Sequence, residues 1–179
     1  MPVIKNIKVD EHELLRYLGY RGQDMGCELI KNIHDISGRC QSLSSPRYCY
    51  NLFDVEQTEN SVHLSGTDIY LEGKDIKRHL DNAEACAVMA VTLGMQVEYE
   101  LTKLEYQSVT NALIFNAACT ALVETAADIC EDEIGKAAAV RGHKKNYRYS
   151  PGYGDFPLEQ QLQLLRLLDT EKRLGITLN

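Results

Sequence analysis

The sequence predicts a single domain of the α+β class. The chain contains two short alternating runs that fit a hairpin, one continuous apolar run that fits a buried strand, and several helical periodicities separate from these strands. Its 179 residues are 44% hydrophobic and 25% charged, which suffices to bury a core without disulfides or a structural metal. We therefore expect one soluble domain over residues 1–179.

Two helices are expected in the N-terminal part of the chain. Asp10 and Glu13 have the spacing of a capping box, and the leucines that follow predict a short helix ending at Gly19. Apolar residues at helical spacing predict a second helix over residues 25–36, with Gly38 as its stop.

The predicted strands follow. Residues 48–55 alternate as a strand, and residues 61–64 form a second short run, so the pair predicts a hairpin. A short helix is expected over residues 73–80. Residues 85–93 are continuously apolar, as in a central buried strand.

Helical periodicity dominates the rest of the chain. Residues 95–134 carry apolar and small residues at steps of three and four, with a break near Leu104 that would divide the helix in two. Residues 158–174 predict an amphipathic helix that ends at Gly175. Residues 176–179 could only start another strand.

The segment 148–157 carries the most specialised chemistry of the chain. Pro151 fixes φ for the second position of a turn and Gly152 accepts positive φ at the third, so residues 150–153 predict a type II turn. Arg148 lies on the extended arm before this turn, where its guanidinium could bind a carboxylate or a phosphate. Main-chain groups beside Gly152 could approach a ligand closely.

Composition and motifs exclude several classes of function. A net charge of −7 argues against nucleic acid as the main partner. The sequence has no P-loop, no dinucleotide fingerprint and no nucleophile elbow. The six cysteines and five histidines show no metal-ligand spacing, so no metal site is expected. With no signal peptide or membrane-length apolar run, the chain is expected to be cytoplasmic.

Each candidate side chain has a plainer interpretation. Glu124 lies in a small, apolar stretch, where a carboxylate is costly unless it is paired, lines a cleft or faces solvent. Arg148 could form a surface ion pair. Tyr153 and Phe156 could simply pack the loop against the last helix.

Taken together, these residues resemble a known family. The run Arg148-x-Ser150-Pro151-Gly152-Tyr153, the leucine-rich helix that follows it and the helix containing Glu124 resemble the activation domain of cobalamin-dependent methionine synthase, which binds S-adenosylmethionine. The region 80–94, ending in Thr-Leu-Gly, looks like that of short stand-alone relatives. The resemblance is strongest over residues 70–178.

The resemblance implies both a fold and a site. The fold would have a central antiparallel sheet flanked by helices. Arg148 would bind the methionyl carboxylate, main-chain groups around Ser150, Gly152 and Tyr153 would hold the adenosine, and Glu124 would bond the ligand's hydroxyl or ammonium groups. No residue is expected to act as a catalytic acid or base, because positioning would be the chain's contribution.

The function implied is that of a reactivation subunit. It would offer the methyl group of S-adenosylmethionine to an oxidised cobalamin carried by a methionine synthase core, with a flavodoxin-like protein as a possible electron donor, and it would not catalyse alone. The basic run from Arg141 to Arg148 would suit docking. An alternative is an S-adenosylmethionine-binding sensor or scaffold without a methyl-transfer role, and a third is an enzyme acting on another small carboxylate.

Overall fold

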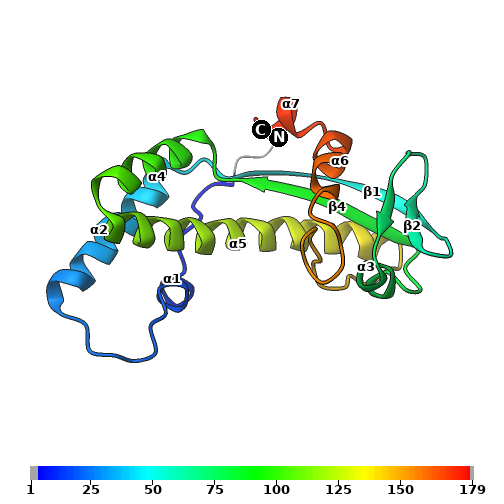
Figure 1. Ribbon diagram of the computed structural model, residues 1–179. Helices are drawn as coiled ribbons and strands as arrows, with labels where there is room; N and C mark the ends of the chain where they lie inside the picture. Colours follow the sequence, from blue (N-terminus) through cyan, green and yellow to red (C-terminus); the bar gives the residue numbers. More distant parts are fainter. Residues whose placement is uncertain (1–3, 178–179) are drawn as a thin grey trace. The chain divides into compact units, whose positions relative to one another are not determined.

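The structure is a computed structural model that describes residues 4–177. In chain order (Figure 1) the helices are α1 (Glu11–Tyr17), α2 (Cys27–Leu43), α3 (Lys74–His79), α4 (Met95–Gln107), α5 (Val109–Val140), α6 (Gln160–Leu167) and α7 (Thr170–Leu174). The strands are β1 (Arg47–Gln57), β2 (Ser61–Leu64), β3 (Tyr70–Glu72) and β4 (Ala85–Thr92).

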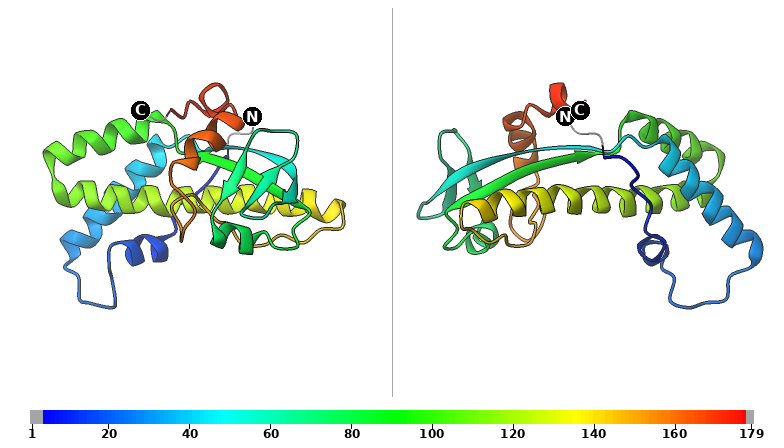
Figure 2. Two further views of the ribbon diagram at one scale, coloured as in Figure 1. Left: turned by 45° about the vertical axis from the view of Figure 1, so that its right-hand side comes forward. Right: turned by 180° about the vertical axis from the view of Figure 1, so that it is seen from behind.

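The strands form one curled, four-stranded antiparallel sheet in the order β3-β2-β1-β4. The predicted hairpin is confirmed, since β1 pairs antiparallel with β2 in the register Val55 to Leu64. The strand expected over residues 85–93 is present as β4, which lies beside β1 (Figure 2). Its expected position as a central buried strand was wrong, because β4 is the last strand in the sheet order and only Val88 and Ala90 of its residues are buried. The short strand β3, which pairs with β2, was not expected from the sequence. The α+β class with an antiparallel sheet and helices is therefore confirmed.

The chain divides into two compact units by its internal contacts. The first comprises Met1–Tyr48 and Val91–Ile129, and the second comprises Cys49–Ala90 and Cys130–Asn179. β1, β4 and α5 each contribute residues to both units. That residues 1–179 form a single domain stays a prediction.

Each unit has its own hydrophobic core. In the first unit α2, α4 and the N-terminal part of α5 bury apolar side chains, among which Phe115, Ala118 and Leu122 are fully buried. In the second unit the sheet packs with α3, α6 and α7, and its core includes Val62, Leu64, Phe156, Leu168 and Leu174.

Helix α5 is long and apolar enough to cross a membrane by length and composition alone. Half of its most apolar window is buried inside the protein, where it supplies core residues such as Phe115 and Ala126. A core helix of a globular protein passes the same test. The expectation that the chain has no apolar run of membrane length was therefore wrong, and a cytoplasmic location stays a prediction.

Two predicted helix boundaries were wrong. α2 continues through Gly38 to Leu43, because Ile36 and Cys40 extend its buried face and this burial outweighs the roughly 1 kcal/mol that an interior glycine costs. The break in the following helical region lies at Ser108, not near Leu104. The Ser108 amide bonds the carbonyl of Leu104, and its hydroxyl accepts the amide of Asn111, so one serine ends α4 and caps α5.

The C-terminal helical region was also predicted wrongly as one continuous helix. Asp169 adopts the left-handed conformation (φ 51°) and separates α6 from α7. Aspartate tolerates this conformation better than most residues, and the break lets Leu168 and Leu174 both enter the core of the second unit. Gly175 ends α7 as predicted. Residues 176 and 177 form no strand, and 178 and 179 lie outside the described residues.

The N-terminal cap of α1 is confirmed in part. The Asp10 carboxylate accepts the amide of Glu13 at 3.0 Å. The Glu13 carboxylate, however, accepts hydrogen bonds from Arg16, at 2.5 Å from Nη2, so it does not complete the reciprocal half of a capping box. The helix ends at Tyr17, and Gly19 follows with positive φ, as the predicted stop requires.

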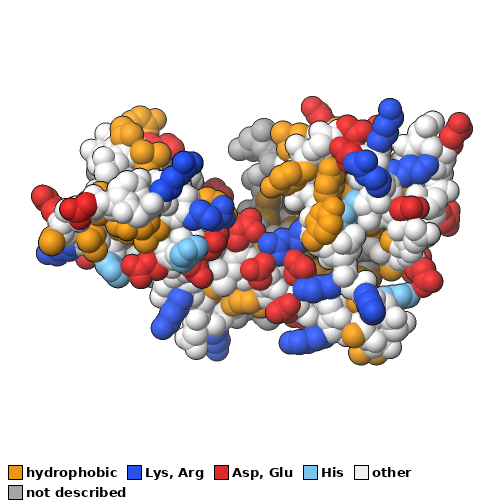
Figure 3. Space-filling view, turned by 90° about the horizontal axis from the view of Figure 1, so that it is seen from below, with side chains coloured by type: hydrophobic (Ala, Val, Ile, Leu, Met, Phe, Trp, Pro, Cys, Tyr) orange, Lys and Arg blue, Asp and Glu red, His pale blue; other side chains and the backbone are white. Residues whose placement is uncertain are grey.

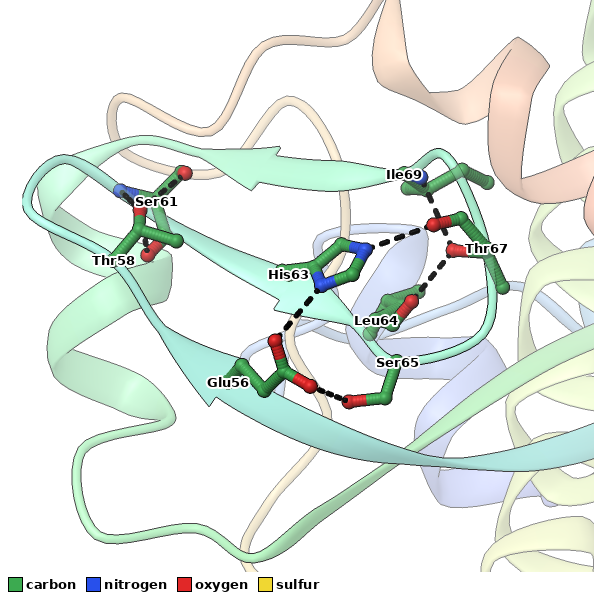
Figure 4. A network of polar contacts seen from close by, with 8 residues as sticks. All are labelled: Glu56, Thr58, Ser61, His63, Leu64, Ser65, Thr67 and Ile69. Carbon is green, nitrogen blue, oxygen red and sulfur yellow. Dashed lines mark hydrogen bonds and ion pairs between the residues drawn. The ribbon is translucent and has the colours of Figure 1, made fainter.

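The turn region beside β2 is fixed by a polar network (Figure 4). His63 lies with Nε2 at 2.8 Å from the carbonyl oxygen of Thr67 and Nδ1 at 3.3 Å from the carboxylate of Glu56. Ser65 donates to the other oxygen of that carboxylate at 3.0 Å. Both ring nitrogens face acceptors, so the Thr67 carbonyl, followed by Glu56, raises the pKa of His63 and favours its imidazolium form.

A side chain forms hydrogen bonds with the backbone of the edge strand β3. Gln160, at the start of α6 and 7% exposed, accepts the amide of Glu72 at 3.2 Å and donates to the carbonyl of Tyr70 at 3.1 Å. Its amide thus pairs with an edge strand as a neighbouring backbone would. This contact joins α6 to the sheet within the second unit.

Gln160→Met is expected to lower the free energy of unfolding by about 1–3 kcal/mol, because two backbone groups of β3 lose their partner at a buried position. Urea denaturation measures the change. The matched control is Gln161→Met at the neighbouring exposed position, which should stay within about 0.5 kcal/mol of the wild type. Equal stabilities for the two variants would show that the bonds to β3 contribute nothing.

Candidate functional site

The loop after α5 contains the predicted turn. The amide of Tyr153 donates to the carbonyl of Ser150 at 3.2 Å, and Gly152 has φ 93°, so the turn over residues 150–153 is confirmed. A second turn follows directly, with the amide of Phe156 donating to Tyr153 at 3.0 Å. The amide of Gly152 closes the loop by donating to the carbonyl of Phe156 at 2.8 Å.

The loop is anchored on the N-terminus of α3. The Asp155 carboxylate accepts the amides of Lys74 at 2.8 Å and Asp75 at 2.9 Å. These bonds, that of Asp75 first, hold the pKa of Asp155 below its ordinary value. Gly73, the residue before α3, has no side chain to cap the helix, so a residue distant in sequence supplies the cap.

Two glycines permit this close approach. A side chain at Gly73 would meet Asp155 at 2.9 Å, and one at Gly154 would overlap the carboxylate of Asp75 and lie 2.7 Å from the hydroxyl of Tyr149. Both glycines have positive φ, at 128° and 55°. Their lack of a Cβ is therefore a requirement of the fold at this point.

An aromatic cluster supports the arm that leads into the turn. The ring of His79, the last residue of α3, lies 4.5 Å from Tyr147 and 5.1 Å from Tyr149 between centroids. Tyr149 in turn stacks on Phe156 at 6.3 Å and donates its hydroxyl to the carbonyl of Tyr153 at 3.2 Å. Phe156 is buried in the core, so the packing interpretation of this residue is confirmed, whereas Tyr153 is 64% exposed.

His79 should make stability depend on pH. Burial lowers the pKa of His79, against an opposing backbone hydrogen bond with Tyr147, and its Nδ1 is buried without a hydrogen-bond partner among the described residues. The unfolded chain takes up this proton near the ordinary pKa of 6.5, and the folded chain only at lower pH. The contribution of His79 is thus complete above about pH 6.5 and is lost as the pH falls towards the folded value.

Urea denaturation at several values between about pH 5 and about pH 8 measures how the free energy of unfolding depends on pH. His79→Phe keeps a ring beside the two tyrosines. In this variant the free energy of unfolding should decline less steeply below about pH 6.5 than in the wild type. His12→Gln, whose native side chain is 91% exposed, is the control and should leave this decline unchanged. An unaltered pH profile in the phenylalanine variant would refute this role of His79.

Arg148 contacts a carboxylate of its own chain. Its Nη1 lies 2.5 Å from Oε2 of Glu131 in the C-terminal part of α5, and Lys145 Nζ lies 3.1 Å from Oε1 of the same residue. The Arg148 and Glu131 side chains are 31% and 20% exposed, so the pair is largely shielded from solvent. The guanidinium is therefore directed at a carboxylate, and the ion pair considered for Arg148 is present.

The structure places the predicted site residues in two groups. Arg148, Ser150, Gly152 and Tyr153 lie together on the loop of the second unit. Glu124 lies on α5 in the first unit, where its residue is exposed. The ligand-binding roles of all five residues stay predictions.

Glu131 and Asp155 were not identified from the sequence. Glu131 begins the run Glu131-Asp132-Glu133, which is typical of a solvated helix face. A signal for Asp155 did exist, because a helix that starts after Gly73 has no local residue to cap it. A helix that starts without a local capping residue indicates that a residue from elsewhere in the chain supplies the cap.

Part of the basic run before the turn is paired with carboxylates of the same chain. Lys145 pairs with Glu131 and with Asp132 at 3.3 Å, and His143 lies 3.4 Å from Glu84. Acidic and basic side chains lie interspersed on the face shown in Figure 3. The expected docking role for this run would thus rest mainly on Arg141 and Lys144, which are exposed.

Two hollows open to solvent lie elsewhere in the described part of the chain. One of about 730 Å³ lies along α2, and one of about 370 Å³ lies beside α6 and α7. Neither is lined by Arg148, Ser150, Gly152 or Tyr153.

The curled antiparallel sheet with its helices is the fold of methionine synthase reactivation domains, as the resemblance in sequence implied. One solved structure with this fold is a crystal structure of the MetH reactivation domain bound to AdoHcy. The TM-score is 0.69 at 16% sequence identity, and the match covers 96% of this chain and 68% of that chain. No family model and no curated protein matches the sequence. At this identity the two proteins share the fold.

Proposed function

We propose that this chain binds S-adenosylmethionine and serves as a reactivation subunit for a cobalamin-dependent methionine synthase. The observation that carries the proposal is the position of Arg148, a largely shielded guanidinium that holds a carboxylate beside the turn. The fold supports it, because the solved reactivation domain is bound to AdoHcy, the demethylated form of S-adenosylmethionine.

The loop offers groups that match the two ends of this ligand. The amino-acid end carries a carboxylate, which Arg148 would bind through charge-assisted hydrogen bonds. At the adenosine end, the amides of Gly152 and Tyr153 are already bonded within the loop. The ligand would therefore meet the Ser150 hydroxyl and main-chain carbonyl oxygens, which keep a second lone pair. The proposed role of Glu124, as a partner for the ammonium or ribose hydroxyls, is carried over from the resemblance alone.

The contribution to chemistry would be positioning. A ligand held at its carboxylate and adenosine has its sulfonium methyl in a fixed place, which lowers the entropic barrier to transfer. Cobalamin, bound by the partner synthase, would supply the metal chemistry that accepts the methyl group. A flavodoxin-like protein is the proposed electron donor, and the chain would not catalyse alone.

Calorimetric titration of the chain with S-adenosylmethionine tests the first part of the proposal. Reactivation of a methionine synthase core that lacks its own activation module tests the second. Restored turnover is the expected result. Binding without restored turnover would instead favour a sensor or scaffold, and absence of binding would contradict both functions.

A further inference from the structure

The carboxylate of Glu131 is shared between two cations. Arg148 lies 2.5 Å from one oxygen and Lys145 lies 3.1 Å from the other, so each cation contacts its own side of the carboxylate. Lys145 also reaches Asp132 at 3.3 Å, whose side chain is 72% exposed. All four residues belong to the second unit.

We propose that Glu131 is an internal competitor for Arg148, which the carboxylate of the ligand displaces, while Lys145 keeps Glu131 paired during the exchange. This inference rests on the proposed function, since it concerns the same arginine. It assigns Glu131 and Lys145 opposite effects on affinity, although neither needs to touch the ligand.

The arrangement favours exchange over a permanent ion pair. A ligand carboxylate on Arg148 would share one guanidinium with Glu131, and two anions a few ångströms apart repel each other. Glu131 is 20% exposed, so its release as an unpaired charge would be costly. Lys145 removes most of that cost, because it already bonds the other oxygen and needs no rearrangement.

The exchange also makes the site selective for ligands that carry a carboxylate. An adenosine compound without one, such as 5′-methylthioadenosine, does not compete for Arg148. Its affinity for the chain should therefore not change when Glu131 is substituted. This difference separates competition at Arg148 from a general effect of charge or of loop stability.

The experiment is calorimetric titration of the full chain with S-adenosylmethionine and with 5′-methylthioadenosine. Glu131→Gln keeps the shape of the side chain and should tighten S-adenosylmethionine binding about tenfold. Its affinity for 5′-methylthioadenosine should stay within about twofold. Glu159→Gln, with the same change of charge at an exposed position on another element, is the control and should change neither affinity.

A substitution of Lys145 tests the opposite effect on affinity. Lys145→Met should weaken S-adenosylmethionine binding about tenfold, because Glu131 then depends on Arg148 alone. Lys144→Met is its control. In the double variant with Glu131→Gln the effect of Lys145→Met should disappear, which makes the two substitutions strongly non-additive.

The outcomes separate this inference from the proposed function. If the wild type binds no S-adenosylmethionine, the proposed function fails and the exchange with it. If the wild type binds but Glu131→Gln binds equally or more weakly, with its melting temperature preserved, the exchange alone is refuted. A Lys145→Met effect that persists in the double variant also refutes it. Where the Glu131 variant is unstable, a single Lys145→Met variant that binds S-adenosylmethionine as tightly as the wild type refutes the exchange on its own.

Discussion

Arg148→Ala is expected to weaken binding of S-adenosylmethionine by about 2–4 kcal/mol, since it removes a charge-assisted contact at a largely shielded position. The fold should persist, because Glu131 keeps Lys145 as its counter-ion at 3.1 Å. Calorimetric titration of wild type and variant measures the difference. Equal affinities would show that Arg148 does not bind the ligand.

Two further variants sharpen this measurement. Arg148→Lys keeps the charge but loses the planar fork, so its affinity should lie between those of wild type and Arg148→Ala. Arg141→Ala removes an exposed charge from the same basic run and should leave affinity within about twofold. A loss at Arg141 as large as that at Arg148 would indicate general attraction instead of a specific contact.

Gly154→Ala is expected to lower the free energy of unfolding by more than about 2 kcal/mol. The substitution forces an L-residue into the left-handed region at φ 55° and drives its Cβ into Asp75 and the Tyr149 hydroxyl. The loop could then keep its turns only by moving away from α3. Urea denaturation measures the cost.

Gly142→Ala separates the two contributions to that cost. Gly142 also has positive φ, at 79°, but a Cβ there meets nothing within 4 Å. It should therefore cost only the backbone penalty of about 1–2 kcal/mol. If the two variants lost equal stability, the contact between the loop and α3 would contribute nothing.

Locally encoded features were predictable from the sequence. The α1 cap at Asp10, the stop at Gly175 and the turn at Pro151-Gly152 follow from residue types within four positions of each other, and all are present. The break at Asp169 was missed because leucine periodicity continues across it, and the gain is tertiary: Leu168 and Leu174 both reach the core. The three-residue strand β3 is too short to show a pattern.

The contacts of the site were less predictable than its loop. The sequence indicated that Arg148 would hold a carboxylate, but the carboxylate in the structure belongs to Glu131, 17 residues earlier. No local pattern distinguishes Glu131 from Asp132, yet the first is 20% exposed and the second 72%. Burial of one acid in a run of three depends on how the loop returns along the end of α5.

The cap that Asp155 gives to α3 has a consequence for the order of folding. α3 has six residues and no capping side chain of its own, and its two bonded amides depend on a carboxylate 80 and 81 positions later. Closing so long a segment is entropically costly, so α3 should consolidate after the folding transition state, with φ-values near zero. In the native state, hydrogen exchange at the amides of Lys74 and Asp75 would follow each transient release of the loop, and so provide a probe of its opening that leaves Arg148 untouched.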